Sequence, residues 1–438
     1  MSGETYSVGI YTLGCKVNQY ESEAIAEAFS ARGFAVKPPS SECDLYVINT
    51  CTVTAESDRK ARQFVRRAIH QNPNAYILVI GCYSQVMPQE VAAISGVDYV
   101  AGNAEKLSVV DVAERLIANQ KKPKVPIIKF DAPDSSGFEA MRIKRFGRTR
   151  AYVKIEDGCE NHCAYCIIPS ARGSVRSKKP EDVLREVKEL TDSGCREIVL
   201  TGIETASYGK DLDGYTLADL LEQIDRLPNV GRIRLGSLDP SRMHQEFVDR
   251  IAPLKSLAPH FHLSMQSGSD RTLAHMKRKY NTQMAKDAVA RLRRAIPGVQ
   301  FTTDMIVGFP GESQSDFEET VAFAKEIGFL MIHVFPYSRR TGTVADQMKE
   351  QIPQEIKHRR VAILSQVAKE SRAILLDQKI GSTDLLLIEG YQNGAAHGHT
   401  PDFCEVRVPC HRPPETEILP IRILSHDGDC CIGEPIEP

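Results

Sequence analysis

Three cysteines stand close together as Cys159-x-x-x-Cys163-x-x-Cys166, directly after an apolar segment at residues 151–155 that is typical of a strand. Thiolates at this spacing on one short loop can all point at a single inorganic cluster, because cysteine is the usual ligand of iron–sulfur centres. Three protein ligands for a cluster with four irons leave one iron open, and an open iron can bind and activate a substrate. The loop therefore predicts a reactive centre rather than an electron wire.

Two other kinds of site could use part of this loop. A C-x-x-C pair can belong to a structural zinc site or to a redox dithiol. Zinc would need a second ligand pair at comparable spacing, and the nearest spare candidates, His162 and Cys195, form no recognisable knuckle. We therefore favour the iron–sulfur interpretation over both alternatives.

Three further cysteines occupy equivalent positions in the N-terminal region. Strands are expected at residues 7–12, 45–49 and 75–80, and helices at 21–31 and 58–70. This alternation predicts a parallel sheet with helices on its faces. Cys15, Cys51 and Cys82 each follow one of these strands, at the carboxyl end where open α/β sheets bind ligands. We favour a second iron–sulfur cluster there; the alternative is three small buried core residues.

The rest of the chain divides by its patterns. Residues 119–148 contain prolines, a Ser-Ser pair and a basic run, which indicate a linker between the first domain (1–118) and the next. Strands of a second βα alternation, in the segment 149–375, are expected at 151–156, 197–201, 232–237, 260–265, 300–307 and 330–335. Six βα units suit a partial barrel with its active site at the carboxyl ends of the strands. Short strands separated by turns in 376–438 predict a small β-barrel. The fold class is therefore α/β.

The composition fits a soluble protein with several domains. The 438 residues are enough for two or three domains, and shares of 42% hydrophobic and 26% charged residues are ordinary. No apolar run approaches the length of a membrane span, and the N-terminus lacks the features of a signal peptide. Twelve cysteines without an export signal indicate a reducing compartment. We therefore expect a cytoplasmic protein with no membrane partner.

Positive charge is clustered, although the net charge is only −2. The clusters are Arg59-Lys60-Ala61-Arg62 with Arg66-Arg67, Lys121-Lys122-Pro123-Lys124, the run from Arg142 to Arg150, Lys277-Arg278-Lys279 and Arg339-Arg340. A basic face of this kind is the electrostatic footprint of a protein that holds a phosphate backbone, whereas any single cluster can also be a solvated helix face. The strongest candidate for phosphate contacts is the run in the predicted loop, with Arg142, Lys144, Arg145, Arg148 and Arg150.

The chain resembles the methylthiotransferases, a family of radical S-adenosylmethionine (radical SAM) enzymes. The likeness lies in Y-T-L-G-C-K-V-N-Q-Y-E-S (11–22), V-I-N-T-C-T-V-T (47–54), G-C-Y-S-Q (81–85) and the loop D-G-C-E-N-H-C-A-Y-C-I-I-P-S. It continues through I-V-L-T-G-I, H-L-S-M-Q-S-G-S, T-T-D-M-I-V-G-F-P-G-E and H-V-F-P-Y-S-R-R-T-G-T, so it covers nearly the whole chain. The first segment is most similar to the branch that acts on threonylcarbamoyladenosine at position 37 of tRNA. The isopentenyladenosine branch typically has G-C-Q-M-N there.

The resemblance implies a cysteine-bearing N-terminal domain, a radical SAM core and a C-terminal TRAM domain. The implied ligands are Cys15, Cys51 and Cys82 for an auxiliary 4Fe–4S cluster, and Cys159, Cys163 and Cys166 for the radical cluster. The resemblance also implies that Ser264, Gln266 and the glycine turn from Gly308 to Glu312 line the S-adenosylmethionine site, where glycines permit close backbone approach. Ordinary strand-end capping is the alternative for Ser264 and Gln266. Glu204, where relatives carry varied residues, is a further candidate contact near the cofactor edge.

The implied reaction explains why such cofactors would be needed. Carbon 2 of an adenine ring bears a hydrogen that no side-chain base can remove as a proton near neutral pH, so a radical-generating cofactor must abstract it as an atom. The resemblance implies that the radical cluster cleaves one S-adenosylmethionine, that the auxiliary cluster holds sulfur, and that a second S-adenosylmethionine methylates this sulfur. The expected partners are tRNA through its anticodon stem-loop, an electron donor and a sulfur source.

Three functions compete at this point. The first is methylthiolation of tRNA, on threonylcarbamoyladenosine or on isopentenyladenosine. The second is the same chemistry on a ribosomal protein side chain, against which the basic linker and the arginine-rich helix argue. The third is a non-enzymatic iron–sulfur RNA-binding protein, which has no need for two sites with an open iron or for a core with S-adenosylmethionine motifs.

Overall fold

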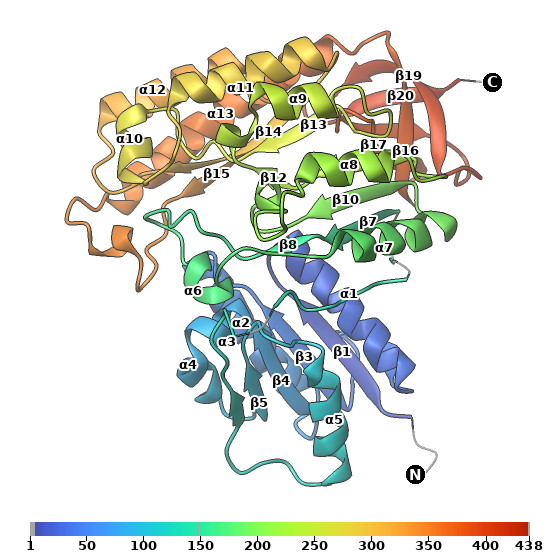
Figure 1. Ribbon diagram of the computed structural model, residues 1–438, viewed down its shortest axis with the longest axis vertical. Coiled ribbons are helices and arrows are strands. Elements are labelled where there is room, and N and C mark those ends of the chain that lie inside the picture. Colours follow the sequence, from blue (N-terminus) through green and yellow to red (C-terminus); the bar gives the residue numbers. More distant parts are fainter. Residues whose placement is uncertain (1–4, 136, 145, 147–148, 437–438) are drawn as a thin grey trace. The chain divides into compact units, whose positions relative to one another are not determined.

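The computed structural model describes residues 5–135, 137–144, 146 and 149–436, which form two compact units (Figure 1). The cysteine unit runs up to residue 144 and also includes 154–179 and 338–343. The barrel unit contains 145–153, 180–337 and 344–438. All six cysteines that the sequence predicts as ligands therefore belong to one unit. None of the helices in the described residues combines the length and the apolarity that are needed to cross a bilayer.

The cysteine unit is built on a six-stranded sheet in the order β2-β1-β3-β4-β5-β6, and all neighbouring strands are parallel. The strands are β1 (Ser7–Thr12), β2 (Ala35–Lys37), β3 (Leu45–Thr50), β4 (Tyr76–Gly81), β5 (Tyr99–Ala101) and β6 (Ile127–Lys129). The three strands predicted from the sequence are β1, β3 and β4, and the parallel sheet is confirmed. β2, β5 and β6 were not predicted, because three residues are too few to show a strand pattern.

Helices cover both faces of this sheet. The helices are α1 (Lys16–Ala31), α2 (Ala55–Gln71), α3 (Cys82–Val86), α4 (Pro88–Ala92) and α5 (Ser108–Ala118). Successive residues of β3 point to opposite faces: Leu45 and Val47 pack with α1 and α5, whereas Tyr46 and Ile48 pack with α2 and α4. α1 and α2 begin earlier than the sequence pattern predicts, because polar residues at their N-terminal ends hide the apolar period. The result is a three-layer arrangement (Figure 1).

The barrel unit contains two sheets within residues 150–336. The first has the order β11-β10-β7 and the second the order β12-β13-β14-β15, with parallel pairing in the second. The strands are β7 (Arg150–Lys154), β10 (Glu197–Thr201), β11 (Arg232–Leu235), β12 (Ser237–Leu238), β13 (His260–Leu263), β14 (Gln300–Val307) and β15 (Met331–Pro336). The predicted strand 232–237 is thus wrong as one element. Gly236 interrupts it, because its N–H donates to Leu200 O (2.8 Å) and the chain then passes to the second sheet.

The helices of the core alternate with these strands, as the βα pattern predicts (Figure 1). They are α7 (Pro180–Asp192), α8 (Leu217–Asp225), α9 (Gln245–Ile251), α10 (Asp270–His275), α11 (Thr282–Ala295), α12 (Gln314–Ile327) and α13 (Gln354–Asp377). Ser313 caps α12 through a capping box with Asp316, and Gly328 ends it in a left-handed conformation. The strand order follows the chain order, which positions the loops after successive strands at one edge.

The C-terminal strands close into a five-stranded barrel in the order β16-β17-β18-β20-β19. They are β16 (Thr383–Gln392), β17 (Ala395–His399), β18 (Glu405–Pro409), β19 (Ile418–His426) and β20 (Cys431–Pro435). The predicted small β-barrel is confirmed, although β17, with the polar sequence A-A-H-G-H, was not predicted. The interior of the barrel is apolar and includes Leu386, Val406, Ile421 and Cys431. Leu376 of α13 packs against these side chains.

Candidate active site

The three N-terminal cysteines stand at one edge of the six-stranded sheet. Cys15 follows β1 and is the N-cap of α1, Cys51 follows β3, and Cys82 follows β4 as the first residue of α3. Because β1, β3 and β4 are neighbours and parallel, their carboxyl ends share this edge. The sequence prediction that one topological position repeats three times is confirmed. Each cysteine also lies at or near a helix N-terminus, where the helix dipole favours a thiolate.

The loops that carry these cysteines are tightly packed. A Cβ on Gly14 would lie 2.7 Å from Cys51 Sγ, so the first cysteine loop passes directly against the second cysteine. Burial raises the pKa of Cys51, and the neighbouring Cys82 and Cys15 raise it further. Cys15 is exposed at its surface, but the protein around its sulfur keeps water away and thereby raises the pKa of the thiol. The positive charge of Arg172 opposes this rise. Three thiols in mutual electrostatic reach are therefore held by the fold.

This donor set fits a thiophilic metal centre. Thiols whose pKa is raised by burial and by one another release their protons when a metal takes up the thiolate charge. Among the described residues, no three side chains of His, Cys, Asp or Glu already converge on one metal position. The fold places the three cysteine loops at one sheet edge without closing their thiols on a single position.

The Cys159 loop lies between two short paired strands of the same unit. β8 (Glu156–Asp157) pairs with β9 (Arg176–Ser177), and the backbone N–H of Cys159 donates to Gly173 O (3.0 Å). Gly158 is required here, because its φ is +86° and a Cβ would lie 1.9 Å from Ser174 O. All three cysteines of the loop are half-buried, and α6 (Ile168–Arg172) follows them directly.

A buried network of charges joins this loop to α1. Glu21 of α1 forms ion pairs with Lys106, with Lys154 (2.8 Å) and with Arg172 (3.0 Å). Asp157, two residues before Cys159, pairs with Lys154 (2.6 Å) and Arg172 (2.9 Å). Although burial raises the pKa of Glu21, the cations of Arg172, Lys106 and Lys154 hold it well below its ordinary value. Removing one partner of such a network leaves an uncompensated buried charge.

The segment 338–343 binds next to Cys51. Arg340 is buried, pairs with Asp58 of α2 (2.6 Å) and donates to Thr52 Oγ1 (2.5 Å). Thr52 Oγ1 in turn donates to Asp58 (2.8 Å). Because Thr52 follows Cys51 directly, Arg340 fixes the second cysteine loop.

The residues expected to contact S-adenosylmethionine lie in the barrel unit, at the carboxyl ends of its strands. Ser264 and Gln266 follow β13, and both are half-buried. Gln266 has a φ of +62°, and its backbone bonds Asp304 and Ile306 of β14. A non-glycine residue in this conformation is held there by its surroundings, which is common at functional sites. Ser264 is tied through its carbonyl oxygen to Tyr280 Oη (2.8 Å).

The turn after β14 is tightly packed against Lys357 and hydrogen-bonded to Glu312. Gly308 has a φ of +71°, and a Cβ there would lie 2.4 Å from Lys357 Cγ. Glu312 is buried; its Oε2 accepts bonds from the Gly308 N–H and from Arg360 (2.5 Å each). Burial raises the pKa of Glu312. One carboxylate oxygen of Glu312 therefore holds the glycine turn.

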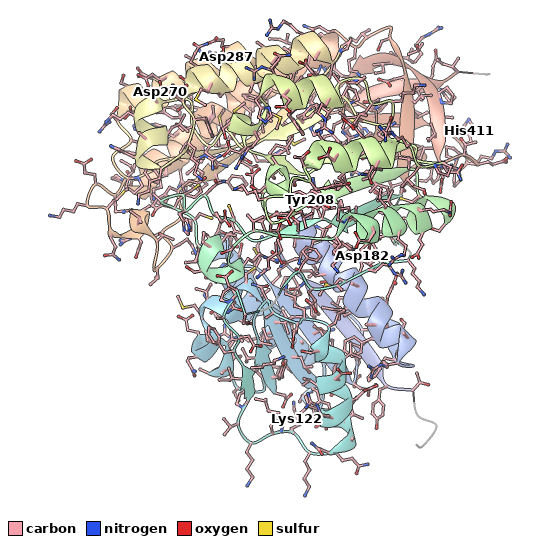
Figure 2. All side chains as sticks on the ribbon, in the orientation of Figure 1. Lys122, Asp182, Tyr208, Asp270, Asp287 and His411 are labelled. Carbon is pink, nitrogen blue, oxygen red and sulfur yellow. The ribbon has the colours of Figure 1, made fainter. Side chains whose placement is uncertain are left out.

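Glu204 is buried in the loop after β10. Its Oε1 accepts a hydrogen bond from the Asp239 N–H (3.0 Å), and Asp239 pairs with Arg278 (2.9 Å). Burial raises the pKa of Glu204 to about 7, with the Asp239 carboxylate adding to the rise. A carboxyl with this pKa can exchange a proton near neutral pH. Tyr208, labelled in Figure 2, lies in the same loop and is also buried.

The basic clusters differ in how much of their charge is engaged. Arg150 begins β7 and pairs with Glu389 (3.0 Å), so it does not match the expected loop residue. Lys122, labelled in Figure 2, pairs with Asp98 (3.2 Å). Arg142 and Lys144 are exposed. Arg145 and Arg148 lie outside the described residues.

Comparison with known proteins follows the same division of the chain. Residues 153–324 match the family model "Radical SAM superfamily", and residues 7–102 match "Uncharacterized protein family UPF0004". The threonylcarbamoyladenosine tRNA methylthiotransferase MtaB of Bacillus subtilis (strain 168) is 42% identical over 371 residues, which are 83% of this chain and 81% of the relative. MtaB of Thermotoga maritima is 36% identical over 424 residues, 96% of each chain. The chain belongs to the radical SAM tRNA methylthiotransferases.

A further relative, and one solved structure with a similar fold, extend the comparison. The tRNA-2-methylthio-N(6)-dimethylallyladenosine synthase of Carboxydothermus hydrogenoformans is 33% identical over 388 residues, 87% of each chain. The radical S-adenosylmethionine methyltransferase TsrM of Kitasatospora setae has a similar fold, with a TM-score of 0.57 at 14% identity over 78% of this chain and 77% of its own. As a radical SAM enzyme, the methylthiotransferase uses S-adenosylmethionine and a 4Fe–4S cluster.

Several residues around the cysteine loops of the methylthiotransferase were not found from the sequence. They are Asn18, which donates to Leu13 O and Thr50 O, Asn103, which donates to Cys82 Sγ, and Arg172. Arg340 was expected only as part of a basic cluster for phosphate; its burial and ion pair with Asp58 correct that expectation. Arginine and asparagine are mostly exposed in proteins, so their types gave no signal of burial. The usable signal was proximity to motifs, because Arg172 follows the cysteine loop within six residues and Arg340 stands in Y-S-R-R-T-G-T.

Gly14→Ala should disrupt the first cysteine loop of the methylthiotransferase. The new Cβ would lie 2.7 Å from Cys51 Sγ, and φ is +98°, so both contact and backbone strain oppose the substitution. Gly33→Ala is the matched control, since its φ is +85° but nothing lies within 4 Å of the new Cβ. Backbone strain costs on the order of 1 kcal/mol in each variant. We expect Gly14→Ala to lose more thermal stability than Gly33→Ala. Only Gly14→Ala should also lose bound iron. Equal stability and full iron content in both variants would contradict the packing argument.

Proposed function

We propose that this enzyme adds a methylthio group to carbon 2 of threonylcarbamoyladenosine at position 37 of tRNA, with two S-adenosylmethionine molecules and two 4Fe–4S clusters. The observation that carries the proposal is the presence of two sets of three cysteines, one at a sheet edge and one on a single loop, within one compact unit. The names of the MtaB relatives support the choice of nucleoside.

The two sets would hold different clusters. In this proposal Cys15, Cys51 and Cys82 bind the auxiliary cluster, and Cys159, Cys163 and Cys166 bind the radical cluster. When bound, the clusters and S-adenosylmethionine supply the electron, the hydrogen-abstracting group and the sulfur that the reaction needs. The chain contributes the enclosure of the thiols, the charges that compensate them and the rigid turns next to them. An electron donor and a sulfur source complete the reaction as partners.

The carboxyl ends of the barrel-unit strands would hold S-adenosylmethionine. Gln266, held by the backbone of β14, and Ser264, whose N–H donates to Leu238 O (2.9 Å), offer polar groups. Gly308 belongs to the turn that would border the cofactor, and it lets Lys357 pack against that turn. In this proposal Glu312 keeps that turn in place, and Glu204 contacts the charged part of the cofactor. A carboxylate can bind an ammonium or a ribose hydroxyl group.

Nucleoside mass spectrometry of tRNA from a strain that lacks the gene tests this proposal. The methylthio derivative of threonylcarbamoyladenosine should be absent and should return with the wild-type gene, while the dimethylallyladenosine derivative should be unaffected. Loss of the dimethylallyladenosine derivative instead would favour the activity named in the relative from Carboxydothermus hydrogenoformans. If both nucleosides were unchanged, a tRNA substrate at this position would be excluded.

Iron analysis tests the number of clusters. Protein reconstituted without oxygen should hold about eight irons and eight sulfides, because two 4Fe–4S clusters each require four of each. Substitution of Cys159, Cys163 and Cys166 by alanine should halve both values. Protein that is saturated with zinc and contains no sulfide would contradict the cluster assignment.

A further inference from the structure

The carboxyl end of α6 contacts the third auxiliary cysteine. Asn103 Nδ2 donates a hydrogen bond to the carbonyl oxygen of Ala171 in α6 (2.7 Å). The same Nδ2 lies 3.5 Å from Cys82 Sγ, within the range of a hydrogen bond to sulfur. α6 itself follows Cys166 directly along the chain. One amide group thus joins the helix after the radical cysteine loop to a ligand of the auxiliary set.

Arg172, the last residue of α6, is linked to the other two loops through Asn18. Its Nη2 donates to Asn18 Oδ1 (2.6 Å). Asn18 Nδ2 donates in turn to Leu13 O (2.7 Å) and Thr50 O (3.0 Å), which lie just ahead of the first and second auxiliary cysteines. The guanidinium group is therefore fixed to the frame that holds all three loops.

The charge on Arg172 is only partly compensated by carboxylates. Glu21 and Asp157 face Arg172, Lys106 and Lys154, and each of these five side chains is at most 7% exposed. Arg176, which pairs with Asp157 (3.8 Å), and Glu139, in electrostatic reach of Lys154 and Glu21, border the same network. These seven groups are four cations and three anions. An excess positive charge in a buried place is unfavourable unless another anion approaches it. Thiolates at the auxiliary position would be such an anion.

The electrostatics of Arg172 agree with this geometry. Burial by itself would lower the pKa of Arg172, but the charges of Asp157, Cys82, Glu21 and Cys15 raise it well above its ordinary value. Two of these four groups are auxiliary cysteines. The same cation lowers the pKa of Cys15 in return.

We propose that Arg172 is a positioning residue that places a fixed positive charge beside the auxiliary cysteines and thereby raises the reduction potential of the cluster they hold. This inference rests on the proposed function, since it requires an auxiliary cluster. Net charge and hydrogen bonds to sulfur are main determinants of iron–sulfur potentials. A nearby cation stabilises the reduced cluster, which carries one more negative charge. Glu21, held to the same guanidinium and in electrostatic reach of Cys15, acts in the opposite direction.

Potentiometric titration with dithionite, followed by electron paramagnetic resonance, measures this effect. The full-length Cys159→Ala/Cys163→Ala/Cys166→Ala protein isolates the auxiliary cluster. In this background, Arg172→Gln should lower the midpoint potential and Glu21→Gln should raise it. The expected size in each case is a tenfold change in the ratio of oxidised to reduced cluster, about 59 mV for a one-electron couple. Arg172→Lys, which keeps the charge, should stay near the parent value.

A control at the far end of α1 separates charge from distance. Arg32 follows α1 and forms exposed ion pairs with Asp111 and Glu114. The sixteen residues of α1 place it about 24 Å from the first turn at 1.5 Å per residue, beyond the Debye length at ordinary salt. Arg32→Gln should therefore leave the potential unchanged.

The outcomes separate this inference from the proposed function. A background protein without any iron would refute the auxiliary cluster itself. The role of Arg172 would be refuted if the cluster is present but its potential moves in the same direction in Arg172→Gln and in Glu21→Gln. It would also be refuted if the potential changes in neither variant. If Arg172→Gln does not fold, Glu21→Gln and Arg172→Lys still decide: a fall in potential in Glu21→Gln, or a large shift in Arg172→Lys, would overturn the inference.

Discussion

Replacing Cys15, Cys51 and Cys82 together by alanine should leave cleavage of S-adenosylmethionine intact and abolish the methylthio product. Cys159, Cys163 and Cys166 stand on a separate loop between β8 and β9, so the variant keeps the ligands that we propose for cleavage. It loses the proposed site of sulfur. Chromatography with mass spectrometry should detect 5′-deoxyadenosine near the wild-type rate and no methylthiolated nucleoside.

Two further variants control this experiment. The Cys159→Ala/Cys163→Ala/Cys166→Ala protein should form neither compound, because it would lack the cluster that we propose starts the reaction. Cys43→Ala removes a buried cysteine of the same unit that lies before β3 rather than after a strand, and it should form both compounds. Methylthiolated nucleoside at the wild-type rate from the first variant would show that the auxiliary cysteines hold no reacting sulfur.

The positions of the cysteines could be predicted because two local patterns coincide. Apolar runs such as L-Y-V-I-N-T mark a strand that is buried on both faces, and a cysteine directly after each run must lie at the carboxyl edge of the sheet. The order of β1, β3 and β4 along the chain is also their order in the sheet. The strand order alone therefore predicts that these three residues, which are far apart in sequence, lie close together.

The contacts of the site could not be predicted, because they join residues that are far apart in sequence. Arg172 and Glu21 are separated by 151 positions, and Arg340 and Asp58 by 282. Charge pairing carries no sequence period, and an arginine gives no sign that it will be buried. The contacts of 154–179 and 338–343 with the rest of the cysteine unit are of the same long-range kind. The sequence suggested that both segments belong to the barrel core, whose strands they follow.

Charge-neutral substitution of Lys60, Arg66 and Arg67 on α2 should weaken tRNA binding and reduce its dependence on salt. All three side chains are exposed, and within the described residues none of them forms an ion pair. Lys60 and Arg67 are seven positions apart, so they share one face of the helix, with Arg66 beside them. α2 begins four residues after Cys51, so this face starts at the edge where the auxiliary cysteines stand.

Phosphate contacts set affinity and register but carry little sequence information. Each contact that is lost should lower the slope of log affinity against log salt by about 0.7 to 0.9. The triple variant should therefore bind all tRNAs less tightly at low salt, approach the wild type as salt rises, and still cleave S-adenosylmethionine without RNA. Filter binding across a series of salt concentrations measures both quantities.

The matched control removes three positive charges from exposed residues of the barrel unit. Arg185, Lys188 and Arg226 are exposed but pair with Asp182, Asp192 and Glu222; Asp182 is labelled in Figure 2. A cation that already has a carboxylate partner gains less from a phosphate, so glutamine at these three positions should change neither affinity nor slope. An equal loss in both triple variants would mean that tRNA responds to net charge alone. An unchanged slope in the α2 variant would mean that this helix face is only solvated, and the other basic clusters, first the exposed Arg142 and Lys144, would be the next to test.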